Sequence, residues 1–249
     1  MRITFLSTWY PYPANTGSKL RVDYLLRALV KRHEVTLLAF DFESALPTEF
    51  RTPPADLVAV ETIPVDPFAV MRRADLRRYC SLRPAVARLI PAMNDALHER
   101  LRKGHIDAVI ASTFVCAPYA LVADTPIIRI LEEHNSLTKW IWERYRQERH
   151  VVKRFRQWIS WQKARLYEAK LLPNFDLITA VSKQDAQTMN DLISGTGKTV
   201  SVVPNGVDIE HNAFSLLHRQ KHVLVYNGSL TYAANWDAVE YFLSAIFPL

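Results

Sequence analysis

Short apolar runs with strand character alternate with segments of helical periodicity along most of this 249-residue chain. The runs are rich in β-branched and aliphatic residues, as expected of strands that are buried on both faces of a parallel sheet. We predict strands over Arg2–Ser7, Glu34–Phe40, Leu57–Val65, Asp107–Ala111, Ile127–Leu131, Asp176–Val181 and Val200–Val203. This alternation predicts an α/β fold built on a Rossmann-like, doubly wound parallel sheet.

The segments between the strands carry apolar residues at helical spacing. The first begins near Val22, and further helical segments are predicted over Phe68–Tyr79, Pro84–Lys103, a long region ending near Leu172, and Lys183–Ile193. Pro91 is expected to kink or split the helix that contains it, because proline lacks an amide hydrogen. Gly104 and Pro173 are expected to end helices.

A loop from Tyr10 to Ser18 joins the first strand to the first helix, and it holds two prolines and Gly17. The free amides and the positive dipole end of a helix N-terminus can receive an anion at such a place. Two interpretations fit, an anion-binding loop and an ordinary connection in which Gly17 serves only a tight turn. The G-x-G-x-x-G pattern is missing here, which weakens the case for a nicotinamide or flavin dinucleotide.

Composition and motifs disfavour several other classes of protein. The chain shows no secretory signal peptide and no apolar run long enough for a transmembrane helix. Cys80 and Cys116 lack metal-like spacing and are expected to be reduced thiols of a cytosolic protein. The segment Gly195–Thr199 lacks the first glycine of a P-loop and precedes a strand, so we interpret it as a surface turn. No metal site is expected, since His211, His218 and His222 have no acidic or cysteine partners at ligand spacing.

Positive charge is concentrated in two stretches, although the net charge is only +6. Met71–Arg88 holds six arginines against one aspartate, and Lys139–Arg165 holds nine basic residues, two glutamates and four of the six tryptophans. The second stretch suits an anionic membrane surface, with cations at the headgroups and tryptophans in the interface. It equally suits a structure in which the tryptophans are core and the charges form a solvated face. Nucleic acid is not expected as a partner, because no nucleic-acid-binding fold accompanies the basic residues.

The character of the sequence changes near residue 210. We assign residues 1–210 to an N-terminal domain, 211–221 to a linker and 222–249 to the start of a further domain. That last part is predicted to hold a strand over His222–Tyr226 and a helix over Asp237–Ile246. One strand and one helix cannot bury a core, so we expect this C-terminal domain to be incomplete.

Four motifs follow one another in the first 210 residues. They are the proline-rich loop ending in Gly17-Ser18, the strand ending in Glu133-His134-Asn135, the segment Asp176–Ser182 followed by Asp185, and Val203–Asp208. Together they resemble the N-terminal half of a GT-B glycosyltransferase of family 4, and Gly228–Val239 resembles the opening of the second domain. The resemblance is strongest to sugar transferases associated with exopolysaccharide biosynthesis at PEP-CTERM/exosortase loci.

The resemblance implies transfer of a sugar from a nucleotide-diphosphate sugar to a glycan or lipid-linked acceptor, usually with retention and without a metal or other cofactor. It implies that Gly17 and Ser18 bind the donor phosphate and that His134 is the catalytic residue beside the transferring sugar. Glu133 and Asn135 are candidates for acceptor contacts. Because strand neighbours point to opposite faces, Glu133 and His134 are not expected to face the cleft together unless the strand has already ended.

Other parts of the motifs are expected to be structural, with Ser182 as a helix N-cap and Asn205–Asp208 as a hinge turn. The chain ends before the glutamate pair with which family members complete the donor site, and Gly228–Leu230 lacks their basic residues. We therefore expect a cytoplasmic enzyme, either truncated or paired with a separate C-terminal GT-B half, that is inactive as this chain alone. The membrane interpretation of the basic stretch would place it peripherally on the inner face of a membrane. The alternatives are a non-catalytic glycolipid- or protein-binding module on the same scaffold, and a GT-B epimerase.

Overall fold

The computed structural model describes residues 1–42, 53, 55–69, 89–122, 126–209, 223–228, 230 and 233–247. The chain divides into two compact units, Met1–Gly206 and Val207–Leu249, which we treat separately. The predicted linker 211–221, the basic stretch Met71–Arg88, Cys80 and most of the helix predicted over Phe68–Tyr79 lie outside the described residues.

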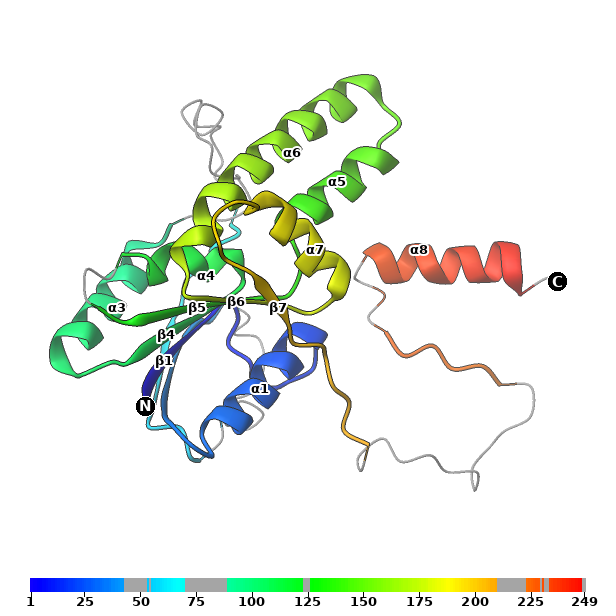
Figure 1. The fold of residues 1–249 in the computed structure, drawn as a ribbon. Coiled ribbons are helices and arrows are strands. Elements are labelled where there is room, and N and C mark those ends of the chain that lie inside the picture. Colours follow the sequence, from blue (N-terminus) through cyan, green and yellow to red (C-terminus); the bar gives the residue numbers. More distant parts are fainter. Residues whose placement is uncertain are drawn as a thin grey trace. The chain divides into compact units, whose positions relative to one another are not determined.

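Seven parallel strands form the described sheet of the first unit, in the order β3-β2-β1-β4-β5-β6-β7 (Figure 1). The strands are β1 (Arg2–Ser7), β2 (Glu34–Phe40), β3 (Ala59–Ile63), β4 (Ala108–Ser112), β5 (Ile128–Glu133), β6 (Leu177–Ala180) and β7 (Val200–Val202). The order reverses at β1, because the chain first adds β2 and β3 on one side and then β4 to β7 on the other. This is a doubly wound sheet, and the fold class predicted from the sequence is confirmed.

Alternating residues of the central strands bury two separate hydrophobic layers. Phe5 belongs to the layer on which helix α1 (Gly17–Leu29) packs with Val22 and Leu26. Leu6, the next residue of the strand, belongs to the opposite layer. Figure 1 accordingly shows α1 on one side of the sheet and α3, α4 and α7 on the other.

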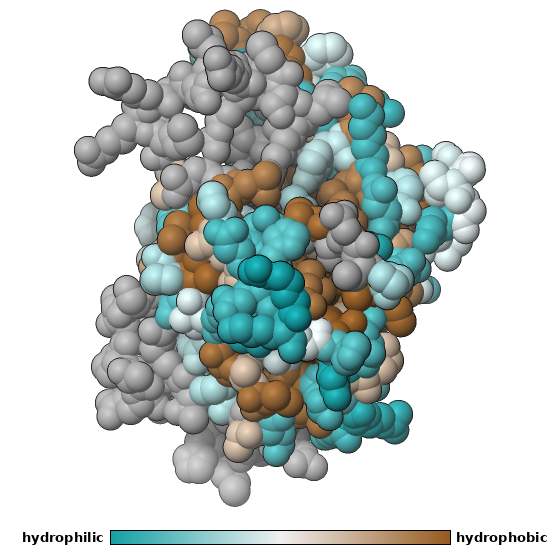
Figure 2. Space-filling view, turned by 90° about the vertical axis from the view of Figure 1, so that its left-hand side faces the viewer, coloured by the Kyte–Doolittle hydropathy of each residue, from teal (hydrophilic) through white to brown (hydrophobic). Residues whose placement is uncertain are grey.

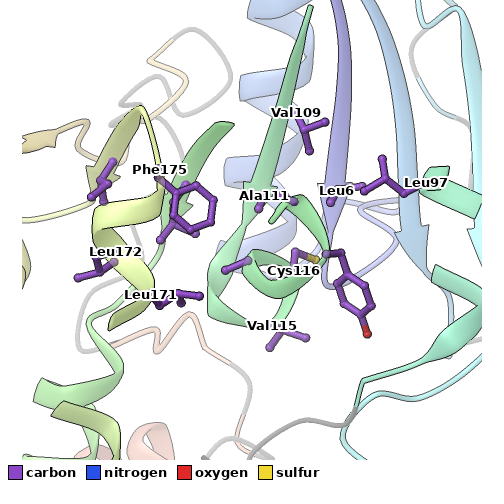
Figure 3. Packing of buried hydrophobic residues seen from close by; sticks show 14 of the residues in the cluster. Leu6, Leu97, Val109, Ala111, Val115, Cys116, Leu171, Leu172 and Phe175 are labelled. Carbon is purple, nitrogen blue, oxygen red and sulfur yellow. The ribbon is translucent and has the colours of Figure 1, made fainter. Parts of the chain in front are cut away.

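That opposite layer is built by α3 (Pro91–Lys103), α4 (Thr113–Ala120) and α7 (Lys183–Leu192). Figure 3 shows Leu97 of α3 and Cys116 of α4 in this cluster together with Leu6 of the sheet. Cys116 is a free thiol with no exposed surface, and burial raises its pKa to about 12. It is therefore an inert core residue.

Two helices, α5 (Leu137–Gln147) and α6 (Val151–Leu171), form a hairpin that extends from the body of the first unit (Figure 1). The chain continues from α6 into a 3₁₀ turn, η2 (Leu172–Asn174), which contains the proline expected to end this helical region. Trp142 and Trp161 pack against each other inside the hairpin, with ring centroids 4.6 Å apart. The four tryptophans of the basic stretch thus differ in environment, because Trp142 and Trp161 pack inside the hairpin whereas Trp140 and Trp158 are 39% and 40% exposed.

Capping side chains, a proline and a glycine mark the ends of the helices. Thr16 caps α1, and the Ser182 hydroxyl accepts a hydrogen bond from the Asp185 amide over 3.1 Å at the start of α7. The predicted N-cap at Ser182 is confirmed. Pro91 is the first residue of α3, where its missing amide hydrogen costs nothing, and Gly104 follows the last helical residue as predicted.

Two helical predictions need correction. The helix predicted over Pro84–Lys103 begins only at Pro91, and the described residues 89–90 just before it are not helical. The helix α4 is absent from the sequence prediction. All its residues except Phe114 and Pro118 are buried, so no apolar stripe stands out against a polar face.

In the second unit, α8 (Ala233–Tyr241) continues into a π-helical segment, η3 (Phe242–Ile246). The helix therefore starts four residues before the predicted Asp237. The strand predicted over His222–Tyr226 is wrong for the described residues 223–226, which pair with no strand and are exposed. In the parts of the chain that the structure describes, no helix is both long and apolar enough to cross a lipid bilayer.

Candidate functional site

The candidate site lies at the carboxyl edge of the sheet, where β1 and β4 mark the topological switch point. Ligands of doubly wound proteins gather at this place. The Thr8 hydroxyl, just after β1, donates to the Ser112 carbonyl over 3.1 Å and lies 2.7 Å from the Thr113 hydroxyl. Thr113 has a φ of +70°, a strained conformation for a β-branched residue. Such strain costs on the order of 1–3 kcal/mol and concentrates at functional sites.

His134 follows directly after β5 and is held by two polar neighbours. Its Nε2 lies 3.0 Å from Glu132 Oε2 and 3.2 Å from the Ser112 hydroxyl. The Trp9 ring stacks on the imidazole with the centroids 6.5 Å apart and the planes 24° apart. The side chain of His134 is therefore fixed in orientation, with 8% of the residue exposed.

Glu132 is the centre of the polar network. Arg21 of α1 donates from Nε to Glu132 Oε1 over 2.5 Å, and the Ser112 hydroxyl donates to Oε2 over 2.9 Å. Burial opposes ionisation of Glu132, but its hydrogen bonds and charge interactions with His134 and Arg21 outweigh burial and lower its pKa. Because an ionised carboxylate only accepts hydrogen bonds, the proton of the shared bond belongs to His134 Nε2.

Arg21 extends the network to a third segment. Its Nη1 donates to Asn205 Oδ1 over 2.9 Å, in the segment that follows β7. The Arg21 side chain is 6% exposed, and its Nη2 has no hydrogen-bond partner among the described residues. One buried cation thus links α1, β5 and the end of the first unit, so Asn205 does more than shape a turn.

Glu133 points away from this network. It is 1% exposed, and burial, with the nearby charges of Glu168 and Glu132, raises its pKa well above the usual range. Glu168, on α6, accepts from the amides of Leu137 and Thr138 over 3.1 and 2.9 Å. The predicted separation of Glu133 from His134 thus follows the alternation of the strand. Its role as an acceptor contact stays a prediction, for a side chain that is buried in this structure.

The other predicted residues lie at the surface of the same edge. Gly17 is the first residue of α1 and is exposed, Ser18 is half-buried, and Asn135 is exposed. Gly17 does not have a positive φ, and a Cβ added there would meet nothing within 4 Å. Neither backbone conformation nor internal packing therefore requires glycine at this position.

Sequence reasoning missed Arg21, Glu132 and Ser112 as members of the site. A signal existed for Glu132, which lies two residues before His134 and so shares its side of the strand. Ser112 ends the strand at the switch point, which is a second usable signal. No group of three or more histidine, cysteine or acidic side chains is placed to hold a metal ion among the described residues.

Comparison with known proteins agrees with this architecture. The profile of Glycosyltransferase Family 4 matches residues 16–211, which is most of the chain. Among proteins with curated descriptions, none matches the sequence.

A solved structure of sucrose-phosphate synthase from Thermosynechococcus elongatus aligns with a TM-score of 0.54 and 13% identity, over 84% of this chain and 49% of that one. The UGT2 of Phytolacca americana, solved with UDP-2fluoro-glucose and pterostilbene, aligns with a TM-score of 0.47 and 13% identity, over 82% and 54%. The chain therefore spans about half the length of the solved proteins it resembles. From the alignment with sucrose-phosphate synthase, its sheet corresponds to the N-terminal half of a GT-B glycosyltransferase. On the extent of the profile match, the chain belongs to glycosyltransferase family 4.

Proposed function

We propose that the carboxyl edge of this sheet is the acceptor-side wall of a site that transfers a sugar from a nucleotide-diphosphate sugar, with retention and without a metal. The observation that carries the proposal is the Arg21–Glu132–His134 network, which fixes an imidazole at the switch point of the sheet. Membership of the family supports the reaction class.

The donor diphosphate is assigned to the first turn of α1. The amides of Gly17 and Ser18 belong to the helix N-terminus, where the backbone dipoles favour an anion. A glycine at the first position lets a phosphate oxygen approach the backbone, and the open space around Gly17 agrees with this role. As the diphosphate leaves, its growing negative charge is stabilised by these dipoles.

His134 is assigned to the sugar. In the proposed retaining reaction, the bond from C1 to the phosphate oxygen breaks and the acceptor oxygen bonds to C1 on the same face. The acceptor proton passes to the departing phosphate. With Nε2 directed at Glu132, the Nδ1 atom of His134 is the ring nitrogen left to hydrogen-bond a sugar hydroxyl. The ring thus positions the sugar while positive charge develops at C1.

The acceptor is proposed to be a glycan or a lipid-linked glycan, with Asn135 as an exposed polar contact beside His134. Trp9 adds an aromatic surface beside the imidazole, and Phe68 stacks on the Trp9 ring with the centroids 5.9 Å apart. Aromatic faces of this kind suit the apolar faces of sugar rings or a prenyl chain.

The test is a screen of nucleotide sugars against soluble glycan and polyprenyl-linked acceptors, using the natural polypeptide that carries this chain. Mass spectrometry of the products separates a new glycoside from an epimerised nucleotide sugar. A glycoside that keeps the anomeric configuration of the donor, formed in the presence of a metal chelator, is the expected result. Binding of donor or acceptor without any product would instead favour a non-catalytic module.

A further inference from the structure

Helix α6 carries a second apolar face whose side chains are exposed. The side chains on it are exposed to very different extents, from 80% at Val151 to 40% at Ile159. The six residues of this outer face are Val151, Val152, Phe155, Trp158, Ile159 and Leu166. Placed at 100° per residue, they fall within an arc of about 120°. The opposite side of the helix packs against α5 through Trp161 and Ala164.

Cations flank the outer face on both sides. Arg156 and Lys163 follow one border of the arc at helical spacing, and Arg154 and Arg165 follow the other. The only acidic residue of α6 is Glu168, which is buried and caps α5. The outward surface of α6 therefore combines an apolar centre with a positive rim and no negative charge.

The hairpin is built to hold this face outward. Trp142 and Trp161 pack between the two helices, and the guanidinium groups of Arg154 and Arg165 lie over aromatic rings at 5.1 and 5.0 Å. At 1.5 Å per residue, the outer face from Val151 to Leu166 is about 22 Å long. Figure 2 shows hydrophobic atoms at the upper end of the molecule, the height at which the hairpin lies in Figure 1.

We propose that the outer face of α6 docks in the plane of an anionic lipid surface. Charge decides between lipid and protein as the occupant. The rim of α6 is of one sign only. Protein interfaces are depleted of lysine, whereas helices that lie in a membrane interface have Lys and Arg beside an apolar face that carries Trp and Phe. The outer face of α6 matches the second pattern, with Phe155 and Trp158 stacked side by side at 6.0 Å.

The position of the hairpin connects docking with the proposed reaction. Helix α5 begins at Leu137, three residues after His134, and spans about 16 Å from there to the turn at the tip. A lipid surface held by α6 is therefore within the reach of a lipid-linked glycan whose sugar lies at the site. Docking itself needs only the outer face, so it does not rest on the proposed function.

The experiment measures cosedimentation with phosphatidylcholine vesicles that contain or lack phosphatidylglycerol, without any donor sugar. The double variant Val151→Ser/Phe155→Ser is compared with Val58→Ser/Phe247→Ser, which makes the same changes at residues 63% and 62% exposed outside the hairpin. We expect the wild type to bind only the anionic vesicles. The hairpin variant is expected to bind them at least about tenfold more weakly, since a loss of 1.4 kcal/mol in binding free energy is a tenfold loss of affinity. The control variant is expected to bind like the wild type.

A charge variant tests the rim separately. Arg156→Gln/Lys163→Gln is expected to weaken binding to anionic vesicles and to reduce its dependence on salt. Circular dichroism confirms that each variant is folded.

Equal binding of wild type and hairpin variant would overturn the proposal. So would self-association of the wild type that the hairpin variant abolishes, because the occupant would then be a second copy. Sugar transfer to a soluble acceptor, measured in parallel, shows whether the reaction survives when docking fails.

Discussion

Arg21 and Glu132 form a buried ion pair between α1 and β5, with Nε and Oε1 2.5 Å apart and a sequence separation of 111 residues. Both side chains are 6% exposed, so each charge depends on the other for compensation. The pair places the first helix, which carries the proposed phosphate site, in fixed relation to His134. The consequences of this arrangement can be measured.

Removing the cation is expected to destabilise the protein strongly. Arg21→Met leaves Glu132 ionised and uncompensated in the interior, which costs about 3–5 kcal/mol in comparable cases. The free energy of unfolding from urea titration measures the loss. The control is Arg2→Met, which breaks the exposed pair with Glu34 and is expected to cost less than about 1 kcal/mol. Similar losses in the two variants would contradict a buried, interdependent pair.

Glu133 predicts a dependence of stability on pH. Its pKa in the folded protein lies above the unfolded value, so between the two values the folded state binds more protons than the unfolded state. Stability therefore falls as the pH rises through this window. Glu133→Gln is expected to remove this fall and to stabilise the protein near neutral pH, because the amide carries no charge to bury at any pH.

Urea titrations across the acidic and neutral range measure this difference. Glu143→Gln changes an exposed glutamate of α5 and is expected to leave the pH dependence unaltered. If Glu133→Gln were as pH-dependent as the wild type, the buried carboxyl would not be the source of the effect.

The strands and the doubly wound class of the sheet were predictable, whereas the pairing within the site was not. An apolar run in the sequence predicts each strand, and the alternation of these runs with helical segments predicts a doubly wound sheet. The contact between Arg21 and Glu132 depends on how α1 packs across the sheet, which no local pattern encodes. Helix α4 was missed for a related reason, because burial on nearly every side removes the periodicity that reveals a helix.

The same limit of local sequence patterns applies to the basic, tryptophan-rich stretch. From sequence, the core and surface interpretations of its tryptophans fit equally well. The structure shows that α6 is apolar on two opposite faces, so Trp161 packs inward while Trp158 faces solvent. Composition could not separate these faces, because the partner helix α5 decides which one is covered.

A substitution of Gly17 shows whether the fold or the binding of the donor requires glycine at this position. Gly17→Ala is expected to keep or raise stability by up to about 1 kcal/mol, since the added methyl group meets no neighbour and reduces the freedom of the unfolded chain. Donor kcat/KM is expected to fall at least about tenfold, as the methyl group blocks the phosphate. Thermal unfolding and donor kinetics on the same preparation measure the two effects.

The matched control is Gly197→Ala. Gly197 has a φ of +75°, where an L residue costs about 1–2 kcal/mol, so this variant is expected to lose stability but not donor affinity. A Gly17→Ala variant that lost stability while keeping its kinetics would assign Gly17 to the fold alone.

The most direct test of the proposed site compares kcat/KM for sugar transfer in His134→Ala and His105→Ala. His105 is an exposed histidine just before β4, at the opposite edge of the sheet. We predict that His134→Ala lowers kcat/KM about 10²–10³-fold, as removal of a positioned hydrogen-bonding group does in other active sites, while His105→Ala leaves it unchanged. A folded His134→Ala variant with wild-type kcat/KM would show that the transfer chemistry takes place elsewhere.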